Sequence, residues 1–152
     1  MIVRRPSRPA GAVRPHGFTL VELVITMGII AILASVAYPS YQEHVVRGRL
    51  GDATRALANG RLRMEQFYLS QRTYVDGPCT QSATEGDFTI VCSSAPTASA
   101  YRITATGSGA TTGFTFSVDQ QDNKRTLALP SGWGTVPSGG YPCWISRKGQ
   151  TC

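Results

Sequence analysis

Apolar residues form one continuous stretch near the start of the chain, from Phe18 to Tyr38. Sixteen of its 21 residues are apolar, and Glu22 carries the only charge. At about 1.5 Å of rise per residue, a helix of this length covers roughly 30 Å, the hydrocarbon thickness of a bilayer. The pattern therefore predicts a membrane-spanning helix over residues 18–38. Pro39 follows directly, and because it removes a backbone donor we expect a helix kink there.

The next segment has the period of an amphipathic helix. Positions alternately four and three residues apart form one apolar stripe: Val46, Leu50, Ala53, Leu57, Gly60, Met64 and Phe67. The arginines from Arg47 to Arg63, and Glu65, fall off this stripe and are expected to face solvent. Gly60 is a poor helix residue, so its place on the stripe predicts a close approach of whatever packs against it. The helix is expected to continue over residues 39–75.

The period changes to two in the second half of the chain. A turn at residues 76–78 and a polar loop at residues 80–86 precede four alternating segments, at residues 88–92, 101–105, 114–118 and 127–129. Gly, Ser, Asp and Asn separate these segments, as is typical of antiparallel hairpins. A long helix whose apolar stripe covers such a sheet is an α+β layer architecture.

The charge of the chain is concentrated at its beginning. The formal net charge is +6, but four of the 15 basic residues lie in residues 1–17, which contain no acid: Arg4, Arg5, Arg8 and Arg14. Without this segment 11 basic residues face 9 acidic ones, so the net charge of +2 is weak support for nucleic-acid binding. The basic segment indicates a cytoplasmic start and an exported C-terminal part.

All cysteines lie in the part that is expected to be exported: Cys79, Cys92, Cys143 and Cys152. An even count in an oxidising compartment predicts two disulfides, with three possible connectivities. Spacing along the chain favours the local pairs Cys79–Cys92 and Cys143–Cys152. The competing hypothesis of a zinc site is disfavoured, because there is no C-x-x-C motif and the only histidines are His16 and His44. We expect no metal and no cofactor.

Other candidate chemistry is weak. The run Asp119–Asn123 superficially resembles a calcium loop, but Lys124 stands where the loop glycine should be and Pro130 where the bidentate glutamate should be. A solvated hairpin turn is the favoured interpretation. With His44 as the one histidine outside the first 17 residues, no Ser-His-Asp or Cys-His set is expected, and we do not expect an enzyme.

The residues around the start of the apolar stretch resemble a known signature. The run Gly17-Phe18-Thr19-Leu20-Val21-Glu22, followed by Ala37-Tyr38-Pro39-Ser40-Tyr41-Gln42, is similar to the prepilin signature of type IV pilins, and in particular of type IVa minor pilins. The resemblance implies that a prepilin peptidase cleaves between Gly17 and Phe18 and methylates the new Phe18 amine. It also implies that Glu22 pairs with the N-terminal amine of a neighbouring subunit during assembly.

An ordinary secretory signal peptide is the alternative interpretation of the same stretch. It would be cleaved after Ala37, in a run of small residues. Its apolar region would then be about 20 residues long instead of 7–15, and it would contain an acid. Both features favour the prepilin interpretation.

The resemblance implies a complete organisation. It consists of a cytoplasmic leader (residues 1–17), a membrane and polymerisation helix (18–38), its amphipathic continuation (39–75) and a β-sheet head (76–152). The implied pilin fold has one long helix on a four-stranded antiparallel sheet, with a disulfide-closed C-terminal loop. The subunit would sit in the inner membrane with its head in the periplasm and then join a cell-surface pilus of other pilin subunits.

The implied function is structural, in pilus biogenesis, adhesion, twitching motility or DNA uptake. Two alternatives remain: a pseudopilin of a type II secretion system, and a DNA-binding competence pilin. DNA would be held weakly by arginines along the helix: Arg47, Arg49, Arg55, Arg61 and Arg63. Asp52 and Glu65 lie among these arginines, so a solvated or inter-subunit face is the competing interpretation.

Overall fold

A single long helix joins the two units of the chain. The computed structural model describes residues 17–152, so most of the expected leader lies outside the described residues. Helix α1 spans Leu20–Gln71 and contains Pro39. One compact unit ends at Pro39 and the other is Ser40–Cys152, and each is described by itself. The kink expected at Pro39 stays a prediction.

The first unit, as far as its residues are described, is an apolar helix whose side chains are exposed. Side chains such as Leu20, Ile32 and Val36 are 69–78% exposed. Among the described helices α1 alone is long and apolar enough to cross a membrane, and none of its apolar window is buried. So much exposed apolar surface requires lipid or other protein around it.

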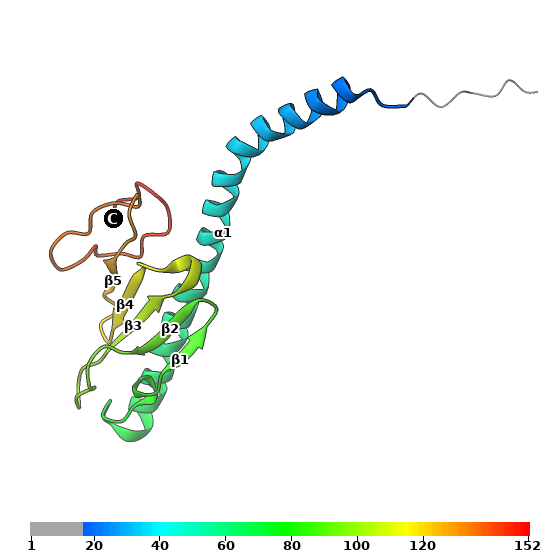
Figure 1. Cartoon of the computed structure of the whole chain (residues 1–152). Helices are drawn as coiled ribbons and strands as arrows, with labels where there is room; N and C mark the ends of the chain where they lie inside the picture. Colours follow the sequence, from blue (N-terminus) through cyan, green and yellow to red (C-terminus); the bar gives the residue numbers. More distant parts are fainter. Residues whose placement is uncertain (1–16) are drawn as a thin grey trace, which may run out of the picture. The chain divides into compact units, whose positions relative to one another are not determined.

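The second unit packs the rest of α1 against a sheet, as the apolar stripe predicts (Figure 1). Leu50, Ala53, Leu57 and Met64 are buried at the helix surface that faces the sheet. A Cβ on Gly60 would lie 3.1 Å from Cδ1 of Ile103, so the close approach expected at this glycine is confirmed. Helix α1 ends at Gln71, where Arg72 adopts a positive φ of 57°.

The sheet is antiparallel and its strands follow chain order. It consists of β1 (Ala83–Glu85), β2 (Phe88–Cys92), β3 (Arg102–Gly107), β4 (Thr115–Asp119) and β5 (Lys124–Ala128). Alternate side chains of the three middle strands form the core under α1, with Phe88, Ile103 and Phe116 fully buried. Ile103 pairs with Val118, and Ala105 with Phe116.

Two details of the sheet differ from the sequence expectation. The sheet has five strands instead of four, because Ala83–Glu85 pairs with β2 inside the segment expected to be a loop. All three β1 residues are exposed, so they produce no alternating apolar signal. In β5, Thr126 is buried while Leu127 is 36% exposed. The pairing with β4 passes from Thr126 to Ala128, and this bulge moves Leu127 off the inner face.

The C-terminal segment is held to the sheet at Thr126. Its backbone exchanges hydrogen bonds with Tyr141 at 3.1 and 3.0 Å. Its hydroxyl donates to the Cys143 carbonyl at 2.8 Å and accepts from the Ile145 N–H at 2.9 Å. The structure joins Cys143 to Cys152 within this segment, and Cys79 to Cys92 beside β2. A short buried threonine therefore anchors a loop that has few apolar residues of its own.

Two glycines of α1 give a matched test of the packing. Gly51→Ala adds a methyl that meets no atom within 4 Å, so the better helix propensity of alanine should stabilise the head by up to about 1 kcal/mol. Gly60→Ala crowds the buried Ile103 side chain and should lose most or all of this gain. Urea unfolding of residues 40–152 followed by circular dichroism measures both. Equal stabilisation by the two substitutions would contradict the close contact at Gly60.

Candidate functional site

The start of α1 positions the residues expected to direct processing and assembly. Phe18 is 82% exposed, and Thr19 precedes the first helical residue. The Glu22 backbone N–H donates to the Thr19 hydroxyl at 3.2 Å, so Thr19 is the N-cap and Glu22 the third helical residue. A threonine and a glutamate at this spacing are the residue types of a capping box. Glu22 thus lies in the first turn of α1, where a carboxylate is stabilised by the helix dipole.

This capping arrangement is a feature that sequence reasoning missed, although the Thr-x-x-Glu spacing signals it. The bond from the Glu22 N–H to Thr19 is formed, and the first-turn position gives the Glu22 carboxylate a local role at the helix N-terminus beside the inter-subunit pairing implied by the resemblance. Cleavage at Gly17–Phe18, methylation of Phe18 and pairing of Glu22 with an amine stay predictions.

The helix arginines proposed to hold DNA are mostly engaged within the head. Arg49 pairs with Asp87, and Arg55 pairs with Asp52 on the same helix. Arg61 lies 3.5 Å from the Asp122 carboxylate. These ion pairs neutralise three of the five candidate cations and leave little free charge on this face for phosphates.

The two remaining arginines, Arg47 and Arg63, have no ion pair within the described residues. Arg47 is partly buried and Arg63 is exposed. The expectation that all these arginines face solvent is therefore wrong for Arg47, Arg49 and Arg61, which are half-buried against the head. Arg49 and Arg61 meet acids on turns of the head, Asp87 before β2 and Asp122 between β4 and β5. Periodicity along the helix cannot reveal such pairing.

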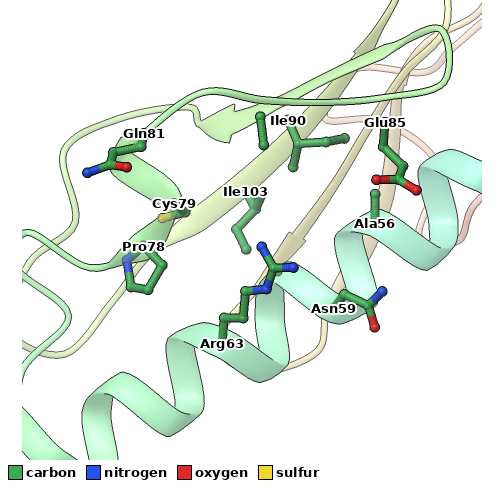
Figure 2. Close-up of a pocket in the computed structure, with 11 residues that line it drawn as sticks. Ala56, Asn59, Arg63, Pro78, Cys79, Gln81, Glu85, Ile90 and Ile103 are labelled. Atoms are coloured by element: carbon green, nitrogen blue, oxygen red, sulfur yellow. The ribbon is translucent and has the colours of Figure 1, made fainter.

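A small hollow lies between α1 and the edge of the sheet near β1, with a volume of about 90 Å³. Asn59 and Arg63 line it from α1, and Gln81 and Glu85 line it from the segment opposite; Figure 2 shows the Arg63 guanidinium pointing toward Ile103. Ile90, Ile103 and the Cys79–Cys92 disulfide supply its apolar lining. Side chains that donate hydrogen bonds and side chains that accept them therefore surround an apolar floor.

Glu65 organises a second cluster that sequence reasoning missed. Its carboxylate accepts a hydrogen bond from the Tyr101 hydroxyl at 3.1 Å and from the Tyr74 hydroxyl at 3.2 Å. Tyr74 also stacks on Tyr68, with ring centroids 4.6 Å apart. Burial, reinforced by the Glu65 carboxylate, raises the pKa of the Tyr74 and Tyr101 phenols. Glu65 is half-buried rather than solvated, and it ties the last turns of α1 to Tyr101, directly before β3.

The Asp119–Asn123 run forms a hydrogen-bonded turn between β4 and β5. The Asp119 carboxylate accepts from the backbone N–H groups of Gln121 and Asn123, both at 3.0 Å, and from the Asn123 amide at 3.0 Å. Burial alone would raise the pKa of Asp119, but these hydrogen bonds outweigh it and lower the pKa. The carboxylate serves the turn, which agrees with the favoured interpretation. Among residues 17–152 no group of three His, Cys, Asp or Glu side chains is placed to hold a metal ion.

Replacing Glu65 tests the tyrosine cluster. Glu65→Ala leaves the Tyr101 hydroxyl without its charged acceptor at a position that is 4% exposed, so we expect a loss of about 1–3 kcal/mol in the free energy of unfolding. Glu65→Gln keeps an acceptor and should cost less. The control is Gln66→Ala, at the exposed neighbouring position, which should stay within about 0.5 kcal/mol of wild type.

The same cluster predicts a pH dependence. Because the phenol pKa values are raised in the folded head, their contribution is complete below the ordinary tyrosine pKa of about 10 and is lost as the pH rises through the folded values. Urea midpoints between pH 7 and pH 11 measure this loss. A wild-type head and a Glu65→Ala head with parallel pH profiles would contradict the role of Glu65.

Comparison with known proteins covers most of the chain. Residues 39–125 match the family described as type IV minor pilin ComP, DNA uptake sequence receptor. Residues 14–38 match the prokaryotic N-terminal methylation motif. No solved structure matches the chain significantly.

Three curated relatives are each similar to about a third of the chain. The fimbrial protein EcpC of Eikenella corrodens is 38% identical over 52 residues, which is 34% of each chain. A type IV major pilin protein PilE1 of Neisseria gonorrhoeae is 37% identical over 54 residues, 36% of this chain and 33% of that protein. A fimbrial protein of Moraxella nonliquefaciens is 48% identical over 44 residues, 29% of this chain and 28% of that protein. The chain thus matches about a third of the length of these relatives.

Proposed function

The chain belongs to the family of the type IV minor pilin ComP, and from this premise we propose that it is a minor structural subunit of a type IV pilus that polymerises through the first half of α1. The observation that carries the proposal is the apolar window of α1, none of which is buried among residues 17–152. Before assembly this helix anchors the subunit in the inner membrane, and after assembly the subunit is part of a surface pilus. A structural subunit of this kind needs no catalytic residues.

We propose that Glu22 pairs with an amine of a neighbouring subunit when the subunit assembles from the membrane. A carboxylate in an apolar helix bundle costs several kcal/mol unless a partner neutralises it. The Phe18 amine that cleavage would release is the partner of opposite charge, and an amine from a neighbouring subunit would fix the stagger between two helices. The match of residues 14–38 to the N-terminal methylation motif supports this processing. The match of the head to a pilus minor pilin favours a pilus over a secretion pseudopilus.

Two substitutions separate the charge of Glu22 from its place in the capping box. Glu22→Ala removes the charge and the capping side chain, whereas Glu22→Gln removes the charge and keeps a side chain that can cap. We expect both precursors to be cleaved as in wild type, with a methylated Phe18 as the first residue, and both to enter filaments poorly. Mass spectrometry of the N-terminal peptide and immunoblots of sheared pili measure the two steps.

Each other outcome has a distinct meaning. Normal incorporation of Glu22→Gln beside poor incorporation of Glu22→Ala would assign Glu22 to helix capping alone. A mature terminus at Tyr38 would mean cleavage by an ordinary signal peptidase and would overturn the pilin proposal.

A second function, DNA binding by the head, is favoured by the family match over residues 39–125. We propose that Arg63 and the hollow beside it contact DNA. Arg63 has no ion pair in the described part of the chain, and Asn59, Gln81 and Glu85 lie around the same hollow. Arginine, asparagine, glutamine and glutamate are the residue types that read base edges. One free arginine provides less phosphate affinity than five, so binding should be weak and sensitive to salt.

Substitution of Arg63 tests this second function. Arg63→Ala should weaken duplex binding about tenfold, because one charged contact with a base or phosphate is lost. The matched control is Lys124→Ala, which removes one charge from β5 and should change binding little. Gel-shift titrations of residues 40–152 with duplexes of several sequences, between 50 and 200 mM salt, measure affinity and its salt dependence. An equal effect of both substitutions would assign binding to net charge, and absence of binding at low salt would refute DNA binding while leaving the pilus proposal intact.

A further inference from the structure

An open hollow of about 370 Å³ lies where the C-terminal loop meets the first turns of α1 in the head. It is lined by His44, Arg47 and Gly48 on α1, and by Ser146 and Arg147 on the loop. All of these residues belong to the unit Ser40–Cys152. The hollow is separate from the one at Arg63, and neither processing nor polymerisation nor DNA binding, as proposed above, uses it.

The cations of this hollow lack counter-charges. Arg47 has its Nε buried without a hydrogen-bond acceptor. Neither Arg47 nor Arg147 forms an ion pair with any described residue. The acid nearest in sequence, Glu43, is taken by Lys148 at 3.4 Å. The buried Nε is out of reach of a ligand in the open hollow, but the guanidinium groups of Arg47 and Arg147 have no carboxylate partner, so an anion between them would neutralise uncompensated charge.

The geometry suits a phosphate group. Guanidinium groups bind phosphate oxygens through two parallel hydrogen bonds, and here two of them come from different elements. The His44 imidazole offers a further N–H. A Cβ at Gly48 would meet no atom within 4 Å, so the helix side of the hollow is open. The loop from Ser146 is braced by the Gln150 side chain, which accepts from the Ser146 and Arg147 N–H groups at 2.9 and 3.2 Å.

The place of the hollow residues along the chain, just after the apolar span, favours a lipid as the source of the phosphate. Tyr38 and Tyr41, at the end of the apolar span, are 65% and 66% exposed, and exposed tyrosines at such an end mark a membrane interface. His44 and Arg47 follow Tyr41 by three and six residues, or about 5 and 9 Å along a helix. The headgroup layer on each side of a bilayer is of similar depth, about 5–8 Å. Because so few residues separate the hollow from the apolar span along the chain, lipid phosphates are within its reach in an anchored subunit.

We propose that this hollow binds the phosphate of an anionic phospholipid, of the phosphatidylglycerol type, in the periplasmic leaflet of the inner membrane before the subunit is assembled. An anionic headgroup fits better than a zwitterionic one, whose ammonium group would be repelled by the two arginines. The lipid contact holds the head against the membrane surface and is broken when the subunit leaves for the filament. The inference rests on membrane anchoring and is independent of DNA binding.

The test uses the full chain in zwitterionic detergent micelles and follows the arginine Nε–H signals by NMR. Dihexanoyl phosphatidylglycerol should shift the Arg47 Nε–H signal saturably. Arg47→Gln and Arg147→Gln should each weaken binding at least tenfold, followed through the amide signals around Gly48 and Ser146. Arg55→Gln is the control, because it removes the same charge from the same helix at a residue that pairs with Asp52 outside the hollow.

Titrations with other ligands distinguish an anionic lipid from other sources of the phosphate group. Equal binding of dihexanoyl phosphatidylcholine would show insertion of acyl chains only and would overturn the proposal. Equal affinity for inorganic phosphate would make this a free-anion site, and a response to duplex DNA but not to phosphatidylglycerol would make it a DNA contact. Either result refutes the lipid assignment. Arg147 is exposed on the loop, so its substitution keeps the test valid should Arg47→Gln disturb folding.

Discussion

The contact between one stripe of α1 and the inner face of the sheet is the interaction on which the head depends. Leu50, Leu57 and Met64 are at most 1% exposed, and the side chains opposite them on β2, β3 and β4 are equally buried. Helical propensity alone does not explain a helix with glycines at positions 48, 51 and 60. The sheet needs the helix for the same reason, because its inner face would otherwise be open to water.

The first half of α1 is apolar on all sides and lacks this partner. A helix of this kind is stable only in a lipid or protein environment, and among the described residues its apolar window is not buried. The two halves of α1 therefore have different environments. The half up to Pro39 needs lipid or another protein around it, and the half after Pro39 packs on the sheet. Under the proposed function, monomer folding and polymerisation use different stretches of the same helix, so the head would be complete before the subunit joins a filament.

The fold was largely predictable from periodicity, because burial against a single layer produces a regular apolar pattern. The stripe from Val46 to Met64 and the strands β2, β3 and β4 illustrate this. Features that depend on partners distant in the sequence were not predictable. β1 is an exposed edge with no apolar signal, the bulge at Leu127 shifts the burial of β5 by one residue, and the partial burial of Glu65 depends on two tyrosines from other segments.

The distribution of charge follows from the same distant contacts, and it bears directly on function. The five helix arginines are alike in sequence, but carboxylates of the head and of α1 itself neutralise three of them and leave Arg47 and Arg63. These two are sixteen residues apart, or about 24 Å along a helix. The hollow at Arg47 lies near the end of the apolar span and the hollow at Arg63 lies beside β1. Because a phosphate at one does not obstruct the other, the two proposed contacts, a lipid phosphate at Arg47 and DNA at Arg63, are compatible in a single subunit.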